Sequence, residues 1–86
     1  MYSVRLLPEA ERFYSNADKP LAKKLARCFE QLETNPHIHP NITRLKGPFA
    51  GHLRFWVGDH RVIYRIEERN RIVIVAIIAH RGEVYG

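Results

Sequence analysis

The sequence is poor in cysteine and has no long apolar run, and each absence excludes a class of protein. Cys28 is the only cysteine, so an intramolecular disulfide and a thiolate metal cluster are excluded, and we expect a small buried hydrophobe at this position. No stretch reaches the ~18 consecutive apolar residues that a membrane-spanning helix requires. The first residues, MYSVRLLPEAERF, become charged too early for a secretory signal. We therefore expect a cytoplasmic protein without a membrane partner.

Two further kinds of site lack the residues that they need. The glycines are placed as turn residues, and no glycine-rich loop that could cradle a phosphate is present. His37 and His39 could ligate a metal ion, but nothing nearby supplies the other ligands at a recognisable spacing. We therefore expect neither a metal ion nor a cofactor.

The length and the charge of the chain indicate the size of the protein and the kind of partner that it would bind. At 86 residues, it has room for one small domain with one core, and no repeat or linker divides residues 1–86. Residues 1–43 contain six Lys/Arg and five Asp/Glu, a net +1, whereas residues 44–86 contain eight and four, a net +4. The second half is therefore electropositive and would attract phosphate groups or an acidic protein partner.

The first half of the chain predicts one strand and two helices. Residues 2–7 alternate as a short strand, and Pro8 suits the first turn of a helix that continues to Asn16. Asp18 is a candidate N-cap for a second helix, which should end near Asn35 because a proline follows. The apolar stripe of this second helix consists of Leu21, Leu25, Phe29 and Leu32.

The second half predicts a long loop and three strands. The loop covers residues 37–51, and the strands cover residues 53–57, 61–67 and 71–79. The last strand is apolar at both alternating positions and is therefore expected inside the sheet. The predicted fold class is α+β: a small single domain in which two N-terminal helices pack on a mostly antiparallel four-stranded sheet, in the order β-α-α-β-β-β. One sheet face takes the helices, and the other carries arginines.

Polar side chains converge where these strands end. Alternation places His52 and Arg54 on one face, and a neighbouring antiparallel strand would set Arg61 beside them. The last strand then delivers His80, Arg81 and Tyr85. These residue types suit cleavage of an RNA phosphodiester by the ribose 2′-hydroxyl, which needs a base, an acid and cations for the charge on phosphate. Arginine suits phosphoryl oxygens, histidine titrates near neutrality, and tyrosine stacks on a base or donates a proton.

Each of these residues also has an ordinary interpretation. Arginines on a sheet face are most often a solvated surface or the docking site of an acidic partner. A lone His52, His60 or His80 is more often a plain polar residue than a general base. Tyr85 could cap the core, as we expect of Tyr64.

Three motifs together resemble a known family. They are RLKG, then R-x-x-VGDxRVIY, then HR-x-x-VY, in this order within residues 35–85. The combination resembles the RelE-type toxins of the RelE/ParE superfamily of bacterial toxin–antitoxin systems. The resemblance implies two N-terminal helices against a mostly antiparallel sheet. It also implies a ribosome-dependent endoribonuclease that cleaves mRNA in the A site by 2′-hydroxyl attack and leaves a 2′,3′-cyclic phosphate.

The resemblance also implies roles for single residues. By motif position, Arg61 and Arg81 match the family's arginines that stabilise the transition state, and Tyr85 matches a tyrosine that stacks on or orients the target nucleotide. His52 and Arg54 stand where a pair of lysines is implicated in proton transfer and phosphate stabilisation. Arginine is a poor general base because its side chain stays protonated in proteins. The candidates for the base are, in order, His80, His52 and Glu83. The expected RNA-binding residues are Arg44, Lys46, Arg54 and Arg61.

The superfamily leaves other functions open. Its ParE-like branch, directed against gyrase, shares the fold but generally lacks this set of arginines and tyrosine. We therefore expect a metal-independent endoribonuclease that inhibits translation. The alternatives are a gyrase-directed toxin and a catalytically inactive relative that binds RNA or protein. The expected partners are the ribosome, mRNA and a cognate acidic antitoxin, through which the complex would bind operator DNA.

Overall fold

The computed structural model describes residues 1–83, and its first half contains the two expected helices. Helix α1 spans Pro8–Asn16 and helix α2 spans Lys19–Thr34. The Asp18 carboxylate accepts a hydrogen bond from the Leu21 N–H at 3.0 Å, which confirms the predicted N-cap. No helix within this described part is long and apolar enough to cross a membrane.

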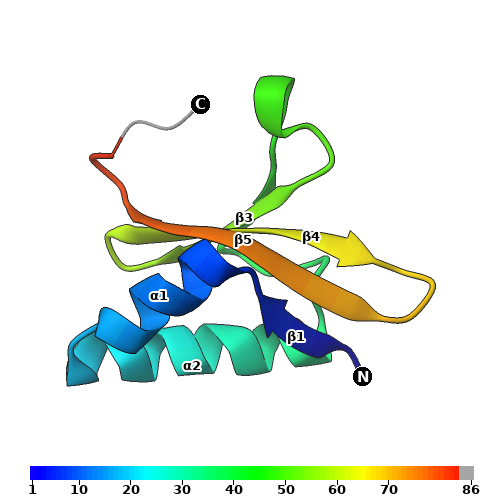
Figure 1. Ribbon diagram of the computed structural model, residues 1–86. Helices are drawn as coiled ribbons and strands as arrows, with labels where there is room; N and C mark the ends of the chain where they lie inside the picture. Colours follow the sequence, from blue (N-terminus) through cyan, green and yellow to red (C-terminus); the bar gives the residue numbers. More distant parts are fainter. Residues whose placement is uncertain (84–86) are drawn as a thin grey trace.

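The sheet has five strands rather than the expected four (Figure 1). They are β1 (Ser3–Leu6), β2 (Ile42–Arg44), β3 (Leu53–Val57), β4 (His60–Glu67) and β5 (Ile72–His80). The additional strand is β2, which lies inside the segment expected to be a loop. It contains only three residues, too few for a visible alternation, and it exists because it pairs with β3.

The strand order β1-β5-β4-β3-β2 confirms the α+β class and the mostly antiparallel sheet. Only the pairing of β1 with β5 is parallel among the pairings of the described strands. Strands β3 and β4 are joined by the predicted two-residue turn of Gly58 and Asp59. Gly58 has a φ of 57°, a left-handed conformation that glycine adopts without steric cost.

Both helices pack on one face of the sheet and form the core with it (Figure 1). The predicted stripe of α2 is confirmed, because Leu25 and Leu32 are fully buried while Leu21 and Phe29 pack against the core. Cys28 is only 3% exposed. Burial raises the pKa of its thiol to about 12, so it is the buried small side chain that the sequence predicted.

Tyr64 connects this core to the segment after α2. Its side chain is fully buried, and its hydroxyl donates a hydrogen bond to the Pro36 carbonyl at 2.7 Å. Burial raises the pKa of Tyr64 above its ordinary value. The structural role expected of this tyrosine is therefore confirmed.

The other face of the sheet is covered by neither helix (Figure 1). We call it the arginine face; it carries Arg54, Trp56 and Arg61, which alternate with core residues along β3 and β4. The 3₁₀ helix η1 (Gly47–Phe49), in the connection between β2 and β3, rises on this side.

Strand β5 departs from simple alternation at one residue. Its pairing with β4 passes from Ile77 to Val75 and leaves Ala76 as an extra residue, a β-bulge. Val75 and Ile78 therefore both face the helices although three positions separate them. The bulge also decides that His80, two residues after Ile78, points to the helix side.

Candidate active site

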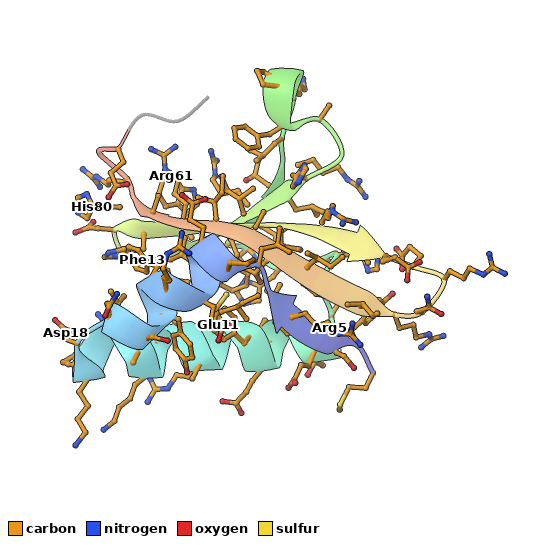
Figure 2. All side chains as sticks on the ribbon, viewed as in Figure 1. Arg5, Glu11, Phe13, Asp18, Arg61 and His80 are labelled. Atoms are coloured by element: carbon orange, nitrogen blue, oxygen red, sulfur yellow. The ribbon has the colours of Figure 1, made fainter. Side chains whose placement is uncertain are left out.

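Arg54 and Arg61 meet on the arginine face at one aromatic ring. Trp56 is the direct cross-strand partner of Arg61, and Arg54 lies two residues before it on the same side of β3. The guanidinium carbons of Arg54 and Arg61 lie 4.8 and 5.5 Å from the centroid of the Trp56 ring, within the ~6 Å range of cation–π contacts. Figure 2 shows Arg61 on the side of the sheet away from the helices. The structure thus brings two predicted site residues together.

Arg54 carries a charge that no carboxylate within the described residues neutralises. Its side chain is half-buried, and its Nε is buried without a hydrogen-bond partner in the described part of the chain. The ion pairs found there join His37 to Glu68 and Arg81 to Asp59. A cation held partly out of water without a counterion favours the binding of an anion.

Arg61 fastens the C-terminal segment to β4. Its Nη2 donates hydrogen bonds to the carbonyl oxygen of Arg81 and, at 3.3 Å, to that of Glu83. The Arg81 N–H donates to the Asp59 carbonyl at 2.7 Å, and the two side chains lie 3.5 Å apart. The Arg81 side chain is 67% exposed, so this ion pair is weak and the guanidinium remains accessible to a ligand.

His80, the first candidate for the general base, lies on the helix side of the sheet. It pairs with His60 across the strands, with ring centroids 5.2 Å apart, and His60 contacts Phe13 of α1 at 5.7 Å. Both histidines line an open pocket of about 280 Å³ beside the start of α2; Figure 2 shows His80 at the end of β5. The structure therefore does not group His80 with Arg54 and Arg61, because the bulge in β5 turns it to the other face.

A backbone hydrogen bond also determines which ring nitrogen of neutral His80 carries the proton. The Gly82 N–H donates to His80 Nδ1 at 3.2 Å, so Nδ1 is the acceptor and the proton of the neutral ring lies on Nε2. Protonation at Nδ1 would require this hydrogen bond to break.

His52 lies on the arginine face by the alternation of β3. It directly precedes Leu53, whose side chain is in the core. Its ring meets that of Phe49 edge-on at 5.9 Å. Its Nδ1 is buried and has no hydrogen-bond partner within the described residues. His52 therefore lies on the same side of the sheet as Arg54.

The remaining predicted site residues are dispersed. Arg44 is the cross-strand partner of Leu53, so it lies on the helix side, away from Arg54. Lys46 is exposed and directly precedes η1. Glu83 is exposed, and Tyr85 lies outside the described residues.

The two histidines of the HIH segment have structural partners. His37 Nε2 lies 2.6 Å from one Glu68 carboxylate oxygen, and the Tyr2 hydroxyl donates to the other oxygen at 2.8 Å. His39 Nδ1 accepts a hydrogen bond from the Asn41 N–H at 3.0 Å. Across the described chain, no three His, Cys, Asp or Glu side chains are grouped so that they could hold a metal ion.

A family model matches nearly the whole chain. The match covers residues 4–85, and the family is described as the ParE toxin of the type II toxin–antitoxin system, parDE. The chain belongs to this family. The RelE/ParE superfamily indicated by the three sequence motifs is thereby confirmed. No curated protein matches the sequence.

Solved structures of toxins share the fold. The RelE–RelB complex from Pyrococcus horikoshii OT3 matches with a TM-score of 0.81 and 20% identity, over 96% of this chain and 98% of that one. The RelBE2 complex from Mycobacterium tuberculosis matches with a TM-score of 0.80 and 22% identity, over 93% of this chain and 98% of that one. The YoeB/ParE toxin from Agrobacterium tumefaciens matches with a TM-score of 0.81 and 17% identity, over 91% of this chain and 96% of that one. At such identities the likeness establishes the fold.

Two residues of this toxin join the site without being predicted for it. The Trp56 ring contacts the guanidinium groups of both Arg54 and Arg61. The sequence could have indicated this, because a large aromatic residue alternates there with an arginine on the face that does not pack against the helices. Asp59 contacts Arg81 through both backbone and side chain. Only the pairing of β4 with β5 reveals this contact, because the sequence marks Asp59 as a turn residue.

Proposed function

We propose that this toxin is an endoribonuclease that cleaves mRNA in the ribosomal A site by attack of the ribose 2′-hydroxyl, leaving a 2′,3′-cyclic phosphate. The observation that carries the proposal is the pairing of Arg54, which no carboxylate of residues 1–83 neutralises, with Arg61, which donates a hydrogen bond to the backbone of Arg81. Guanidinium groups suit a phosphoryl group whose negative charge grows in the transition state. Such an enzyme inhibits translation and works in the cytoplasm.

The arginines supply the charge that this reaction needs. Arg61 and Arg81 bind the phosphoryl oxygens, and Arg54 supports them. The proposal therefore requires no metal ion. Loss of one such donor typically lowers the rate by ~10²–10³.

His52 is the general base that the geometry favours. It lies on the arginine face, whereas His80 lies on the helix side and uses its Nδ1 to accept from Gly82. Glu83 follows as the third candidate. Tyr85 orients the target nucleotide in this proposal, and Lys46 contacts the RNA backbone. Arg44, on the helix side, has no part in it.

An acidic antitoxin is the partner that the charge of the toxin favours. The chain has a net charge of +5, and the structural relatives from P. horikoshii and M. tuberculosis are toxin–antitoxin complexes. A disordered acidic segment that folds against the arginine face would neutralise Arg54 and cover the site. In this proposal the complex binds operator DNA through the antitoxin, and the free toxin binds the ribosome and mRNA.

One observation favours a second function. The family model that matches the chain is described as the ParE toxin, and a ParE-like toxin would act on gyrase instead of mRNA. A third outcome, a catalytically inactive relative that binds RNA or protein, would retain the arginine face without cleavage.

Primer extension on a defined mRNA separates these functions. Purified protein is added with and without programmed ribosomes that carry an empty A site, and Arg81→Ala is tested beside it. We expect cuts within the A-site codon only with ribosomes, and their loss in Arg81→Ala. Arg27→Ala is the matched control, because Arg27 is exposed on α2 and should leave both cleavage and growth inhibition unchanged.

Two results would contradict the proposal. A correctly folded Arg81→Ala protein that still cleaves would remove Arg81 from the site. Folded, toxic wild-type protein that makes no cuts would favour the gyrase-directed function, and trapped DNA breaks with purified gyrase would then be the decisive assay.

A further inference from the structure

Trp56 and the two guanidinium groups beside it form a layered surface on the arginine face. The ring is half-buried and belongs to β3, on the face of the sheet that neither α1 nor α2 covers. Arg54 and Arg61 lie 4.8 and 5.5 Å from its centroid. The two arginines come from different strands, β3 and β4. Because both contact the same ring, the ring fixes their positions relative to each other.

This surface combines positive charge with flat groups, and few ligands bind to both. The guanidinium of Arg54 has a buried Nε without a hydrogen-bond partner among the described residues, and no carboxylate of these residues neutralises it. Such a group favours an anionic ligand. The Trp56 ring and the planar guanidinium groups offer flat faces, which stack well on nucleobases.

These properties select one class of ligand. A free phosphate would satisfy the arginines and leave the ring unused. An acidic peptide would also satisfy the charge, but it carries no flat ring at each residue. A single-stranded nucleotide supplies both a phosphate and a base with two π faces.

We infer that Trp56, Arg54 and Arg61 form a binding subsite for one nucleotide of single-stranded RNA, in which the base stacks on the layer around Trp56 and its phosphate contacts the arginines. This inference rests on the proposed function and names a substrate contact within it. Arg61 also holds the segment of Arg81, so the subsite adjoins the place where cleavage would occur. The nucleotide on Trp56 is thus a neighbour of the scissile phosphate.

The chain provides its own probe for this subsite. Trp56 is the only tryptophan, so all tryptophan fluorescence comes from the proposed site. The wild-type protein is titrated with a non-cleavable 2′-deoxy trinucleotide and with an abasic trinucleotide of the same charge. We expect saturable quenching with the base-bearing ligand only. We also expect it to bind about 5- to 150-fold more tightly than the abasic one, the range that base stacking on aromatic side chains produces.

Two variants test whether the ring itself is responsible. Trp56→Leu keeps an apolar side chain without a π face, and by anisotropy of labelled ligands it should bind both trinucleotides equally. Trp56→Phe keeps a smaller π face and should recover part of the preference. Circular dichroism checks that both variants fold. If Trp56→Leu fails to fold, the milder Trp56→Phe change still tests the inference.

The outcomes separate this inference from the proposed function. Equal affinity of the wild type for both trinucleotides, without quenching, would overturn the subsite even if the protein cleaves mRNA on ribosomes. A base preference that Trp56→Leu retains would overturn it as well. A protein that shows the base preference and its loss in Trp56→Leu, but cuts no mRNA, would support the subsite and contradict the cleavage proposal.

Discussion

Arg61 shows how one side chain can connect three parts of the site. Its guanidinium contacts the Trp56 ring and two carbonyl oxygens, those of Arg81 and Glu83. A lysine would keep the charge and could donate to both carbonyls, but it would lose the planar group that lies against the Trp56 ring. The side chain therefore matters for its shape as well as for its charge.

Tyr64 is a residue whose contribution can be measured apart from the site. Replacing Tyr64 with Phe removes the hydroxyl that donates to the Pro36 carbonyl in the core and leaves that acceptor without its partner. We expect the free energy of unfolding to fall by about 1–3 kcal/mol, measured by urea denaturation.

Tyr14→Phe provides the matched control for this prediction. The Tyr14 ring packs edge-on against Phe29 at 5.2 Å, a contact that phenylalanine would keep. Its effect should stay within about 0.5 kcal/mol. Equal effects of the two substitutions would show that the hydroxyl of Tyr64 adds nothing specific.

The turn between β4 and β5 is tied to two distant elements through Glu68. Its carboxylate contacts His37, after α2, and the Tyr2 hydroxyl, before β1. The hydrogen bond from His37, followed by that from Tyr2, holds the pKa of Glu68 below its ordinary value. The hydrogen bond between Tyr2 and Glu68 also raises the pKa of Tyr2.

This cluster predicts a dependence of stability on pH. Because the pKa of Glu68 is lower in the folded protein, its stabilisation is present above the unfolded-state value of about 4.3 and is lost as the pH falls through the folded-state value. Glu68→Gln should therefore lower the urea midpoint at neutral pH, and the difference from wild type should shrink below about pH 4. Urea titrations from neutral to acidic pH measure this.

A control separates the cluster from a general effect of charge. Glu30→Gln removes the same charge from an exposed position on α2 and should change the midpoint little. A difference between wild type and Glu68→Gln that stays constant down to the lowest pH would contradict the assigned contacts.

At the scale of the whole molecule, three arginines gather on one face of the sheet. Arg54, Arg61 and Arg65 occupy alternate positions on the side of β3 and β4 away from the helices. The net charge of +5 attracts any polyanion, but a site on one face should respond to charge at that face.

Charge reversal on two faces tests this. Arg65→Glu and Arg12→Glu both change the formal net charge from +5 to +3, but Arg12 lies on α1, and both side chains are exposed. We expect only Arg65→Glu to weaken binding to non-cleavable single-stranded RNA strongly. It should also reduce the slope of log K against log salt concentration by roughly 0.7, the value for one phosphate contact. Equal weakening by both variants would indicate that net charge alone controls binding.

Much of this toxin could be predicted where the signals are local. The Asp18 cap, the stripe of α2 and the turn at Gly58 depend on residues within a few positions of each other. Arg54 and Arg61 were expected on one face because alternation along neighbouring strands predicts it. The cap, stripe and turn are confirmed, and the structure places the two arginines together.

The sequence by itself determined the two helices, the Asp18 cap of α2, the buried residues of α2 and the electropositive second half, because these follow from spacing and composition along the chain. Only the tertiary structure decided that β1 lies beside β5, that β2 is a strand, and that the bulge at Ala76 turns His80 away from Arg61. It also decided that Arg61 holds Arg81 and that Trp56 joins two arginines. These features depend on the register between segments far apart in the chain, and a shift of one residue moves a side chain to the opposite face of a sheet.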